Sequence, residues 1–377
     1  MTGCDAIFPG YGFLSENQDF VEICKLHNIK FIGPSSEVME KMADKSKAKE
    51  EMVRAGVPVV PGSKGAVRTL DEGKKIAREI GYPIMAKASA GGGGRGMRLI
   101  KEEKDFDSQY LAASSEALAA FGDGTMYLER FINNPRHIEV QVIGDSHGNA
   151  IHIGERDCSL QRRHQKVIEE SPAILLNDET RAKLHEVAVK ATKYLKYEGA
   201  GTFEFLADDK QNIYFMEMNT RLQVEHPVSE MVSGLDIIEW MIKVAEGEKL
   251  PPQESIRFRG HAIECRITAE DPNNFLPCPG KITQWMVPGG RNVRVDSHIY
   301  TNYIVPPYYD SMIGKLIVWG RDREKAINIM KRALSEFEVE GIKTNIPFHK
   351  KMMENKDFIS NNYDTKYLEN YKGLDSI

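Results

Sequence analysis

The sequence contains no apolar run of the roughly 18 residues that a membrane-spanning helix needs. Its first residues, MTGCDAIFPGYG, lack a basic segment followed by a long apolar one, so no secretory signal peptide is predicted. Positive charge is not in excess, because 50 Lys and Arg residues face 55 Asp and Glu residues. Broad nucleic-acid binding needs a basic face, so we expect neither a nucleic-acid nor a membrane partner.

Cysteine is also sparse. The five cysteines are widely spaced, and none forms a CxxC pair. Zinc sites use closely spaced ligand pairs, and disulfides are rare in reducing compartments, so we expect free thiols and a cytoplasmic protein. With 377 residues, of which 41% are hydrophobic and 28% charged, the chain is long enough for two or three globular domains.

The first forty residues read as an α/β region. CDAIFPG and IKFIGPS are typical of short strands, and SENQDFVEICKLHN between them predicts an amphipathic helix with Ser15 as its N-cap. This order is typical of the last part of a doubly wound domain. The segment MADKSKAKEEMVRAG then predicts a single helix over residues 42–56, ended by Gly56.

Four consecutive glycines, Gly91 to Gly94, lie inside KASAGGGGRGMRLI, which begins at Lys87. The residues on either side read as strands, so the pattern predicts a strand–loop–strand hairpin. A P-loop or a dinucleotide-binding loop would lead into a helix instead. Glycines let backbone N–H groups converge on an anion, and Lys87 and Arg95 add positive charge. We favour a flap that covers phosphates, with a plain turn as the alternative.

A second hairpin is predicted in GTFEFLADDKQNIYFMEMNTR, with DDKQN as its turn. Symmetric pairing about the turn places Glu204 opposite Glu217, with Cβ atoms roughly 5 Å apart, where like charges repel. A divalent cation would remove the repulsion, and Asn219 shares the face of Glu217. Two carboxylates and an amide suit Mg²⁺ or Mn²⁺. The alternative is a solvated face on which the two glutamates splay apart.

Arg221 and Glu225 follow this hairpin in TRLQVEHP. An arginine can fork onto a planar anion, and a nearby glutamate can act as a general base. The alternative is an ordinary surface ion pair.

The segment ERDCSLQRRHQKVIEE concentrates basic residues, namely Arg156, Arg162, Arg163, His164 and Lys166. Binding of single-stranded RNA would need interleaved aromatic residues, so we favour a pocket for small anions. His137, in NPRHIEVQV, is either a structural histidine or a nucleotide contact.

The glycine flap, the lysine before it and the glutamate hairpin together resemble an ATP-grasp site. The segments PGYGFLSEN, RDCSLQRRHQK, EMNTRLQVEHPV, HAIECRI and PPYYDSMIGKL narrow this resemblance to the biotin carboxylase family, over nearly the whole chain. The resemblance implies ATP-dependent carboxylation of biotin by bicarbonate through carboxyphosphate, as the first half-reaction of acetyl-CoA carboxylase in fatty acid synthesis. ATP, two Mg²⁺ or Mn²⁺ ions and carrier-bound biotin are the implied cofactors and substrate.

The same resemblance assigns roles to individual positions. It implies phosphate contacts at Lys45, Lys87, Gly93 and Gly94, an adenine hinge over Glu129, Arg130, Phe131 and Ile132, and nucleotide contacts at His137, Gln161 and His164. Glu204 and Glu217 would bind the metal and belong to the ATP site, with Asn219 as a further metal ligand. The bicarbonate cradle would comprise Lys166, Arg221 and Val224. Glu225 would be the base, Arg221 would stabilise the biotin enolate, and Arg266 would face biotin.

The fold implied by the resemblance is an α/β, or α+β, ATP-grasp fold. We expect a partial N-terminal doubly wound domain over residues 1–42, a connecting helix over 43–58, an ATP-grasp lid with the flap over 59–131, and a C-terminal core over 132–377. Phe8 stands where the family usually has histidine, and the resemblance leads us to expect that the opening strands of the family are absent.

The expected partners are a biotin carboxyl carrier protein, carboxyltransferase subunits and a second copy of the chain in a homodimer. Three alternatives share some of the motifs. One is another ATP-grasp ligase, which makes carbamoyl phosphate or carboxylates a purine. Another is the biotin carboxylase subunit of a different acyl-CoA carboxylase or of a pyruvate carboxylase. The third is a truncated, non-catalytic form that binds the carrier or a partner subunit.

Overall fold

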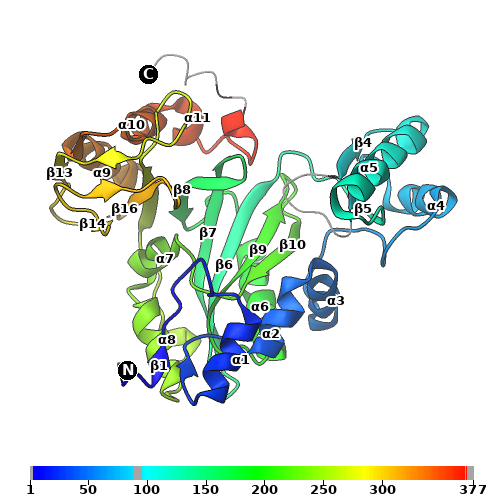
Figure 1. The fold of residues 1–377 in the computed structure, drawn as a ribbon, viewed down its shortest axis with the longest axis horizontal. Helices are drawn as coiled ribbons and strands as arrows, with labels where there is room; N and C mark the ends of the chain where they lie inside the picture. The colour runs from blue at the N-terminus through cyan, green and yellow to red at the C-terminus, as the bar shows by residue number, and fades with distance from the viewer. Residues whose placement is uncertain (1–2, 89–95, 370, 372–377) are drawn as a thin grey trace. The chain divides into compact units, whose positions relative to one another are not determined.

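The computed structural model describes residues 3–88, 96–369 and 371, and the chain divides into two compact units (Figure 1). Unit 1 comprises residues 1–57, 134–213 and 217–377. Unit 2 comprises residues 58–133 together with 214–216. The mixed α/β class predicted from the sequence is confirmed.

Unit 1 begins with a small parallel sheet, in which β1 (Ala6–Ile7) pairs with β2 (Lys30–Phe31) and α1 (Gln18–Leu26) connects them. The cap of α1 is Asn17, whose side chain accepts a hydrogen bond from the backbone N–H of Phe20 at 2.7 Å. The prediction that Ser15 caps this helix is therefore wrong. Ser15 instead donates its backbone N–H to Gly12 in a turn that delays the helix, and asparagine caps as well as serine does.

The predicted single helix over residues 42–56 is two helices, α2 (Ser36–Ala43) and α3 (Lys45–Ala55). They are separated at Asp44, which has an extended backbone with ψ of 118°. The Asp44 side chain accepts a hydrogen bond from the backbone N–H of Lys47 at 2.9 Å, as an N-cap does. The predicted helix over residues 42–56 is therefore interrupted at Asp44, which caps the start of α3. Gly56, with φ of 81°, follows the end of α3 as predicted.

An eight-stranded sheet forms the centre of unit 1, in the order β10-β9-β6-β7-β8-β11-β16-β14 (Figure 1). Its strands are β6 (Arg136–Gly144), β7 (Ala150–Arg162), β8 (Gln165–Ser171), β9 (Gly199–Ala207), β10 (Ile213–Asn219), β11 (His261–Thr268), β14 (Val293–Asp296) and β16 (Met312–Gly320). The pairings from β9 across to β14 are antiparallel. The predicted DDKQN hairpin is present, because β9 and β10 are neighbours that flank residues 208–212.

Helices cover this sheet because alternate side chains of each strand are apolar. The remaining helices of unit 1 are α6 (Asp178–Tyr194), α7 (His226–Ser233), α8 (Ile237–Ala245), α9 (Arg323–Glu336), α10 (Ile346–Glu354) and α11 (Lys356–Ile359). On β11, Ala262 packs with α7, whereas Cys265 belongs to the cluster that includes α9. Successive strand residues point to opposite faces, so α7 and α9 cover opposite faces of β11. The face under α7 carries the side chains described below.

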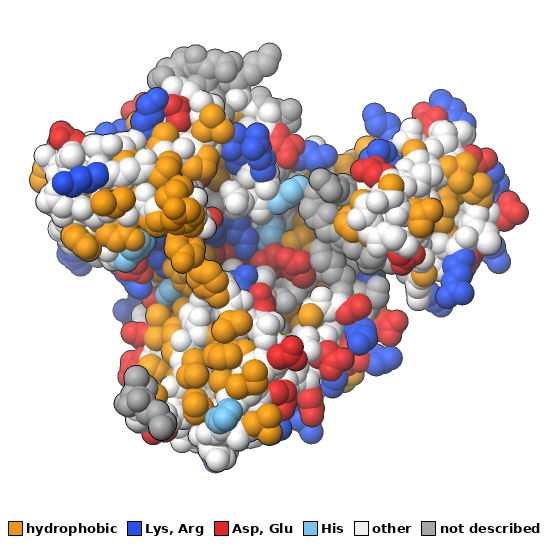
Figure 2. All heavy atoms as spheres, in the orientation of Figure 1, with side chains coloured by type: hydrophobic (Ala, Val, Ile, Leu, Met, Phe, Trp, Pro, Cys, Tyr) orange, Lys and Arg blue, Asp and Glu red, His pale blue; other side chains and the backbone are white. Residues whose placement is uncertain are grey.

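Short elements complete unit 1. They are the strands β12 (Gly280–Lys281), β13 (Gln284–Met286), β15 (Ile304–Val305) and β17 (Glu338–Glu340), with 3₁₀ turns at Gln253–Ser255 and Tyr367–Glu369. β12 pairs with β15, and β13 pairs with β17. Hydrophobic side chains also form patches on the surface seen in Figure 2. Phe13 is 91% exposed, and its ring meets that of Tyr309 edge-on.

Unit 2 is a three-stranded antiparallel sheet packed against two helices. Its elements are α4 (Leu70–Ile80), β3 (Ile84–Ala88), β4 (Met97–Ile100), a 3₁₀ turn at Glu103–Asp105, α5 (Phe106–Phe121) and β5 (Met126–Arg130), and its strand order is β4-β3-β5. Phe106 and Ala113 of α5 are fully buried against this sheet. β3 leads to β4 and not to a helix, so the predicted strand–loop–strand hairpin is confirmed. The glycines of its loop, residues 91–94, lie outside the described residues.

Candidate active site

Two buried glutamates face each other in the central sheet. Glu139 on β6 lies directly opposite Glu204 on β9, and both side chains are buried. Like charges in this arrangement repel each other, so the fold must supply compensating positive charge. Glu204 was predicted from the sequence, but Glu139 was not. Its signal was the alternation of His137, Glu139 and Gln141 in β6, which puts three polar side chains on one face of a buried strand.

Lys166 on β8 supplies that positive charge. Its Nζ donates hydrogen bonds to Glu204 at 2.9 Å, to Glu225 at 2.7 Å and to Glu139. An ammonium group has three donors, so three carboxylates use all of them. Burial opposes the charge of Lys166, but the carboxylates outweigh it and raise its pKa well above the ordinary value. Although burial alone would raise them, the pKa values of Glu139 and Glu204 are lowered by Lys166.

His137 completes a group that could hold a divalent cation. Its Nε2 lies 3.0 Å from Glu204 Oε2 and 3.1 Å from Glu139 Oε1, yet it forms a hydrogen bond with neither. Burial would lower the pKa of His137, but the two carboxylates raise it to about 9. The ligand atoms of the three side chains lie within 4.8 Å of one another. This group could hold a divalent cation once the His137 ring has lost its proton, because imidazole binds metals in its neutral form and carboxylates are common ligands.

Two of the three predicted metal ligands lie at this group. The Asn219 Nδ2 donates a hydrogen bond to Glu204 Oε1 at 2.6 Å. Glu217 is on the same strand, β10, and is partly buried. The role of Glu217 as a ligand stays a prediction.

Glu225 lies between two cations at the start of α7. Lys166 donates to its Oε1 at 2.7 Å, and the Arg266 Nη2 donates to its Oε2 at 2.9 Å. Burial would raise the pKa of Glu225, but the nearby cations lower it. Glu225 is therefore a buried, charged carboxylate, and each of its oxygens keeps a further lone pair that can accept a proton.

Arg221 is positioned by the N-terminal segment. Its Nε donates to Glu16 Oε2 at 2.9 Å, and its Nη2 donates to Asn219 Oδ1 at 3.3 Å. Glu16 Oε1 also accepts the backbone N–H of Thr220 at 3.0 Å. Glu16 lies within the motif PGYGFLSEN but had no predicted role of its own, because 205 residues separate it from Arg221. Next to this group, the carbonyl oxygen of Val224 accepts a hydrogen bond from Lys315.

Not all residues of the basic segment line an anion pocket. Arg156 is fully buried and donates to Glu139 and Gln141, at 2.9 and 2.7 Å. It is a structural counter-ion, because its guanidinium is satisfied inside the sheet. His164 is at the exposed turn between β7 and β8, with φ of 63°. Gln161 is buried, and its Nε2 lies 2.9 Å from His137 Nδ1.

Unit 2 holds the remaining predicted nucleotide contacts except Lys45, which belongs to unit 1. Lys87 on β3 donates to Glu129 Oε2 on β5 at 2.6 Å, and the two residues lie on adjacent antiparallel strands. Arg130 ends β5, and Phe131 and Ile132 follow it. Phe131 donates its backbone N–H to the carbonyl of Pro83 at 3.0 Å. Gly93, Gly94 and the side chain of Lys45 lie outside the described residues.

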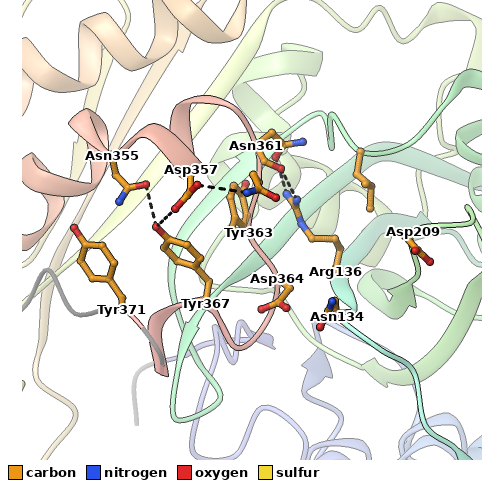
Figure 3. A pocket seen from close by; sticks show the side chains of 12 residues that line it. Asn134, Arg136, Asp209, Asn355, Asp357, Asn361, Tyr363, Asp364, Tyr367 and Tyr371 are labelled. Carbon is orange, nitrogen blue, oxygen red and sulfur yellow. Dashed lines mark hydrogen bonds between the residues drawn. The ribbon is translucent and has the colours of Figure 1, made fainter. Parts of the chain in front are cut away.

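A cavity of about 710 Å³ opens elsewhere in unit 1 (Figure 3). Arg136 at the start of β6, Asp209 of the β9–β10 turn, and Asp357 and Tyr367 near the C-terminal end line part of it. None of the predicted site residues lines this cavity. Tyr367 donates to Asp357 at 3.0 Å, and Arg136 stacks on Tyr363, so its polar groups satisfy one another.

Three family models together match most of the chain. They are the biotin carboxylase N-terminal domain over residues 1–39, the carbamoyl-phosphate synthase L chain ATP binding domain over 44–253, and the biotin carboxylase C-terminal domain over 264–370. A biotin carboxylase of Nostoc is 56% identical over 97% of this chain and 82% of its own length. Biotin carboxylase 1 of Bacillus subtilis is 52% identical over 100% of this chain and 84% of its own.

The chain belongs to the biotin carboxylase family. It is thus a ligase, and the predicted ATP-grasp fold is confirmed by solved structures. A Campylobacter jejuni biotin carboxylase, in a β,γ-ATP complex, shares 69% identity with a TM-score of 0.90, over 97% of this chain and 82% of that one. The biotin carboxylase domain of Hydrogenobacter thermophilus 2-oxoglutarate carboxylase, with MgADP and bicarbonate, shares 51% identity with a TM-score of 0.90, over 100% and 83%. Among the described residues, no helix combines the length and apolar character needed to cross a bilayer.

Proposed function

We propose that this biotin carboxylase family member uses ATP and bicarbonate to carboxylate biotin on a biotin carboxyl carrier protein, in the cytoplasm, as the first half-reaction of acetyl-CoA carboxylase. The observation that carries the proposal is the position of Glu225 between Lys166 and Arg266. A buried carboxylate flanked by two cations can receive an anion that still carries a proton. Bicarbonate is such an anion, and it becomes a good nucleophile once a base removes that proton.

In the proposed first step, an oxygen of bicarbonate attacks the γ-phosphorus of ATP. The bond to ADP breaks, carboxyphosphate forms, and Glu225 accepts the bicarbonate proton. Lys166 and Arg221 hold the bicarbonate oxygens, with the backbone of Val224. A divalent cation held by Glu204, Glu217 and Asn219, close to His137 and Glu139, would offset the charge of the phosphate oxygens.

In the second step, carboxyphosphate releases phosphate and gives carbon dioxide. The released phosphate accepts the N1′ proton of biotin, and the nitrogen forms a bond to the carbon of carbon dioxide. Arg221 stabilises the biotin enolate, and Arg266 orients the ureido ring. Both guanidinium groups are fixed by carboxylates, Arg221 by Glu16 and Arg266 by Glu169 and Glu225. Such preorganised charges stabilise a developing anion without reorganising during the step.

ATP would be held by residues that the family motifs name. We propose phosphate contacts at Lys45, Lys87, Gly93 and Gly94, and an adenine hinge over residues 129–132. His137, Gln161 and His164 are the proposed contacts to the rest of the nucleotide. The domain boundaries at residues 42, 58 and 131 and the homodimer are part of the same proposal.

Release of ADP from Mg-ATP tests this function, with bicarbonate and biotin each present or absent. Turnover should require bicarbonate and should rise when biotin is added. Glu225→Gln should abolish it, whereas Glu239→Gln, on the exposed part of α8, should leave it unchanged. ADP release at the same rate with and without bicarbonate would contradict the proposal.

The final acceptor is tested by transfer from the carboxylated carrier. The relatives include the small subunit of a 2-oxoglutarate carboxylase from Hydrogenobacter thermophilus and one subunit of a pyruvate carboxylase from Methanothermobacter thermautotrophicus, both 52% identical to this chain. We expect that the carrier and carboxyltransferase subunits from the source of this chain will carboxylate acetyl-CoA. Transfer to pyruvate or 2-oxoglutarate instead would assign the chain to one of those carboxylases.

A further inference from the structure

A pair of buried carboxyl groups lies behind Arg266. Glu169 on β8 is directly opposite Glu264 on β11 in the antiparallel register, and both residues have 0% exposure. Directly opposed side chains have Cβ atoms roughly 5 Å apart. Neither glutamate had a role predicted from the sequence, and the proposed steps use only Glu169, as a hydrogen-bond partner of Arg266.

Only one of the four carboxyl oxygens of Glu169 and Glu264 accepts a hydrogen bond. Glu169 Oε1 accepts a hydrogen bond from the Arg266 Nε at 2.6 Å. Glu169 Oε2 and both carboxyl oxygens of Glu264 are buried without a hydrogen-bond partner. Buried carboxylate oxygens are normally satisfied, and an unpaired buried charge costs several kcal/mol or more. Three orphan oxygens on two opposed carboxyl groups are therefore not expected if both groups are ionised.

The surrounding cations cannot neutralise two negative charges here. Arg266 also donates to Glu225 Oε2 at 2.9 Å, so its single charge is already shared. Lys315 on β16 donates its Nζ to the carbonyl of Val224 at 2.8 Å and lies 3.6 Å from Asp296.

Two further titratable groups, on α7 and β8, supply no free positive charge. Burial lowers the pKa of His226 to about 3, so this ring adds no positive charge. Lys166 is bonded to Glu139, Glu204 and Glu225.

We propose that Glu169 and Glu264 share one proton, and that the pair, carrying a single negative charge, positions Arg266 against Glu225. A proton between the two carboxyl groups provides a hydrogen bond for an oxygen that otherwise has no partner. It also leaves one negative charge on Glu169 to hold the Nε edge of Arg266. With two charges, the pair would compete with Glu225 for the same guanidinium. Glu169 and Glu264 are thus positioning residues, because they act through Arg266.

The direction of the pKa values agrees with this geometry. Burial is the main cause that raises the pKa of Glu169 to about 7, although Arg266 opposes the rise. Burial also raises the pKa of Glu264 well above its ordinary value, with Glu169 adding to the effect. Two carboxyl groups at one site cannot easily both ionise, so the pair retains one proton near neutral pH.

Infrared spectroscopy of the full chain tests the shared proton directly. A protonated carboxyl group has a carbonyl stretch separate from the carboxylate bands. The wild-type spectrum at pH 7.5 should contain such a band, and both Glu264→Gln and Glu169→Gln should lose it, since one remaining carboxyl group can ionise beside Arg266. The control Glu340→Gln, at an exposed position on β17, should keep the band. Absence of the band in the wild type, or its survival in both variants, overturns the proposal.

Kinetics test the positioning role, and this part rests on the proposed function. Each single variant keeps one carboxyl group that can bear the negative charge, so each should stay within about threefold of wild type in kcat/KM for biotin. The double variant has no such group and should lose about tenfold more than the product of the two single effects, mainly in kcat. Independent effects in the double variant would refute the positioning role. Because the infrared test needs no turnover, it distinguishes failure of this inference from failure of the proposed function.

Discussion

Glu16 Oε2 accepts a hydrogen bond from the Nε of Arg221 at 2.9 Å, which ties the N-terminal segment to the strand that carries the predicted metal ligands. We expect Glu16→Gln to lower bicarbonate-dependent ADP release about tenfold, which corresponds to about 1.4 kcal/mol of transition-state stabilisation. The reason is positional, because Arg221 loses the carboxylate that orients its guanidinium.

Stability should change much less, because Glu16 is 41% exposed and pairs of this kind contribute at most about 1 kcal/mol. Thermal unfolding of Glu16→Gln checks this part. Glu37→Gln, at an exposed position on α2, is the matched control. An unchanged rate in Glu16→Gln would show that Arg221 needs no anchor.

Lys166→Gln should destabilise the fold strongly. It removes the only cation that donates to Glu139, Glu204 and Glu225 together among the described residues. Loss of one partner from a buried ion pair typically costs about 3–5 kcal/mol. Differential scanning calorimetry should show the loss, and Mg²⁺ or Mn²⁺ should restore more stability to this variant than to wild type.

The control for that variant is Lys210→Gln, in the exposed turn between β9 and β10. It should melt like wild type with or without divalent cation. Equal stabilisation of both variants by the metal would argue against a cation site at His137, Glu139 and Glu204.

Much of this site could be predicted from sequence, because its residues lie in compact motifs. Lys166, Glu204, Asn219 and Glu225 are near one another in the structure, as the hairpin and the family resemblance implied. The strand–loop–strand form of the glycine segment also followed from apolar runs on both sides. These are local patterns, in which a few neighbouring residues decide the outcome.

The missed residues act through pairs that are distant in sequence. The alternation in β6 put Glu139 on a polar face, but only the β6–β9 register shows that it lies opposite Glu204. Arg156 was predicted to belong to a basic loop. It lies on β7 instead, with its side chain buried and paired with Glu139. The helix cap at Asn17 was missed because a serine two residues earlier satisfied the same rule. Strand register cannot be derived from composition, so these features follow only from the three-dimensional fold.

Acid should weaken the fold partly through Glu155 on β7. Burial would raise its pKa, but hydrogen bonds from His185 and Arg181 lower it from 4.5 to about 2. A lowered folded-state pKa gives stability that is present above pH 4.5 and is lost as pH falls toward 2. The difference between the two pKa values corresponds to about 3 kcal/mol.

Glu155→Gln should therefore cost stability at pH 7 and much less at pH 3. Denaturant unfolding at the two values, followed by circular dichroism, measures the difference from wild type. Asp178→Asn is the control, because Asp178 also meets Arg181 but its side chain is fully exposed. A penalty for Glu155→Gln that does not change with pH would contradict the prediction.

Gly144→Ala should be poorly tolerated at the end of β6. A Cβ atom there would lie 2.0 Å from the carbonyl oxygen of Tyr197, a backbone atom that cannot rotate away. Overpacking of this kind costs about 1–3 kcal/mol or more. Gly289→Ala is the matched control, because a Cβ at Gly289 meets nothing within 4 Å. Thermal melts of the two variants should differ by several degrees, and equal melting temperatures would disprove the clash.

The bond between Glu169 and Arg266 also has a consequence for synthesis of the chain. These residues are 97 positions apart, and ribosomes add about 5–20 residues each second. Glu169 is therefore synthesised on the order of 5–20 s before Arg266. Before Arg266 has been synthesised, the Glu169 carboxylate on β8 has no cation to pair with. The central sheet therefore cannot bury this strand. Closure of the central sheet around β8 must therefore follow synthesis of β11, the strand that carries Arg266.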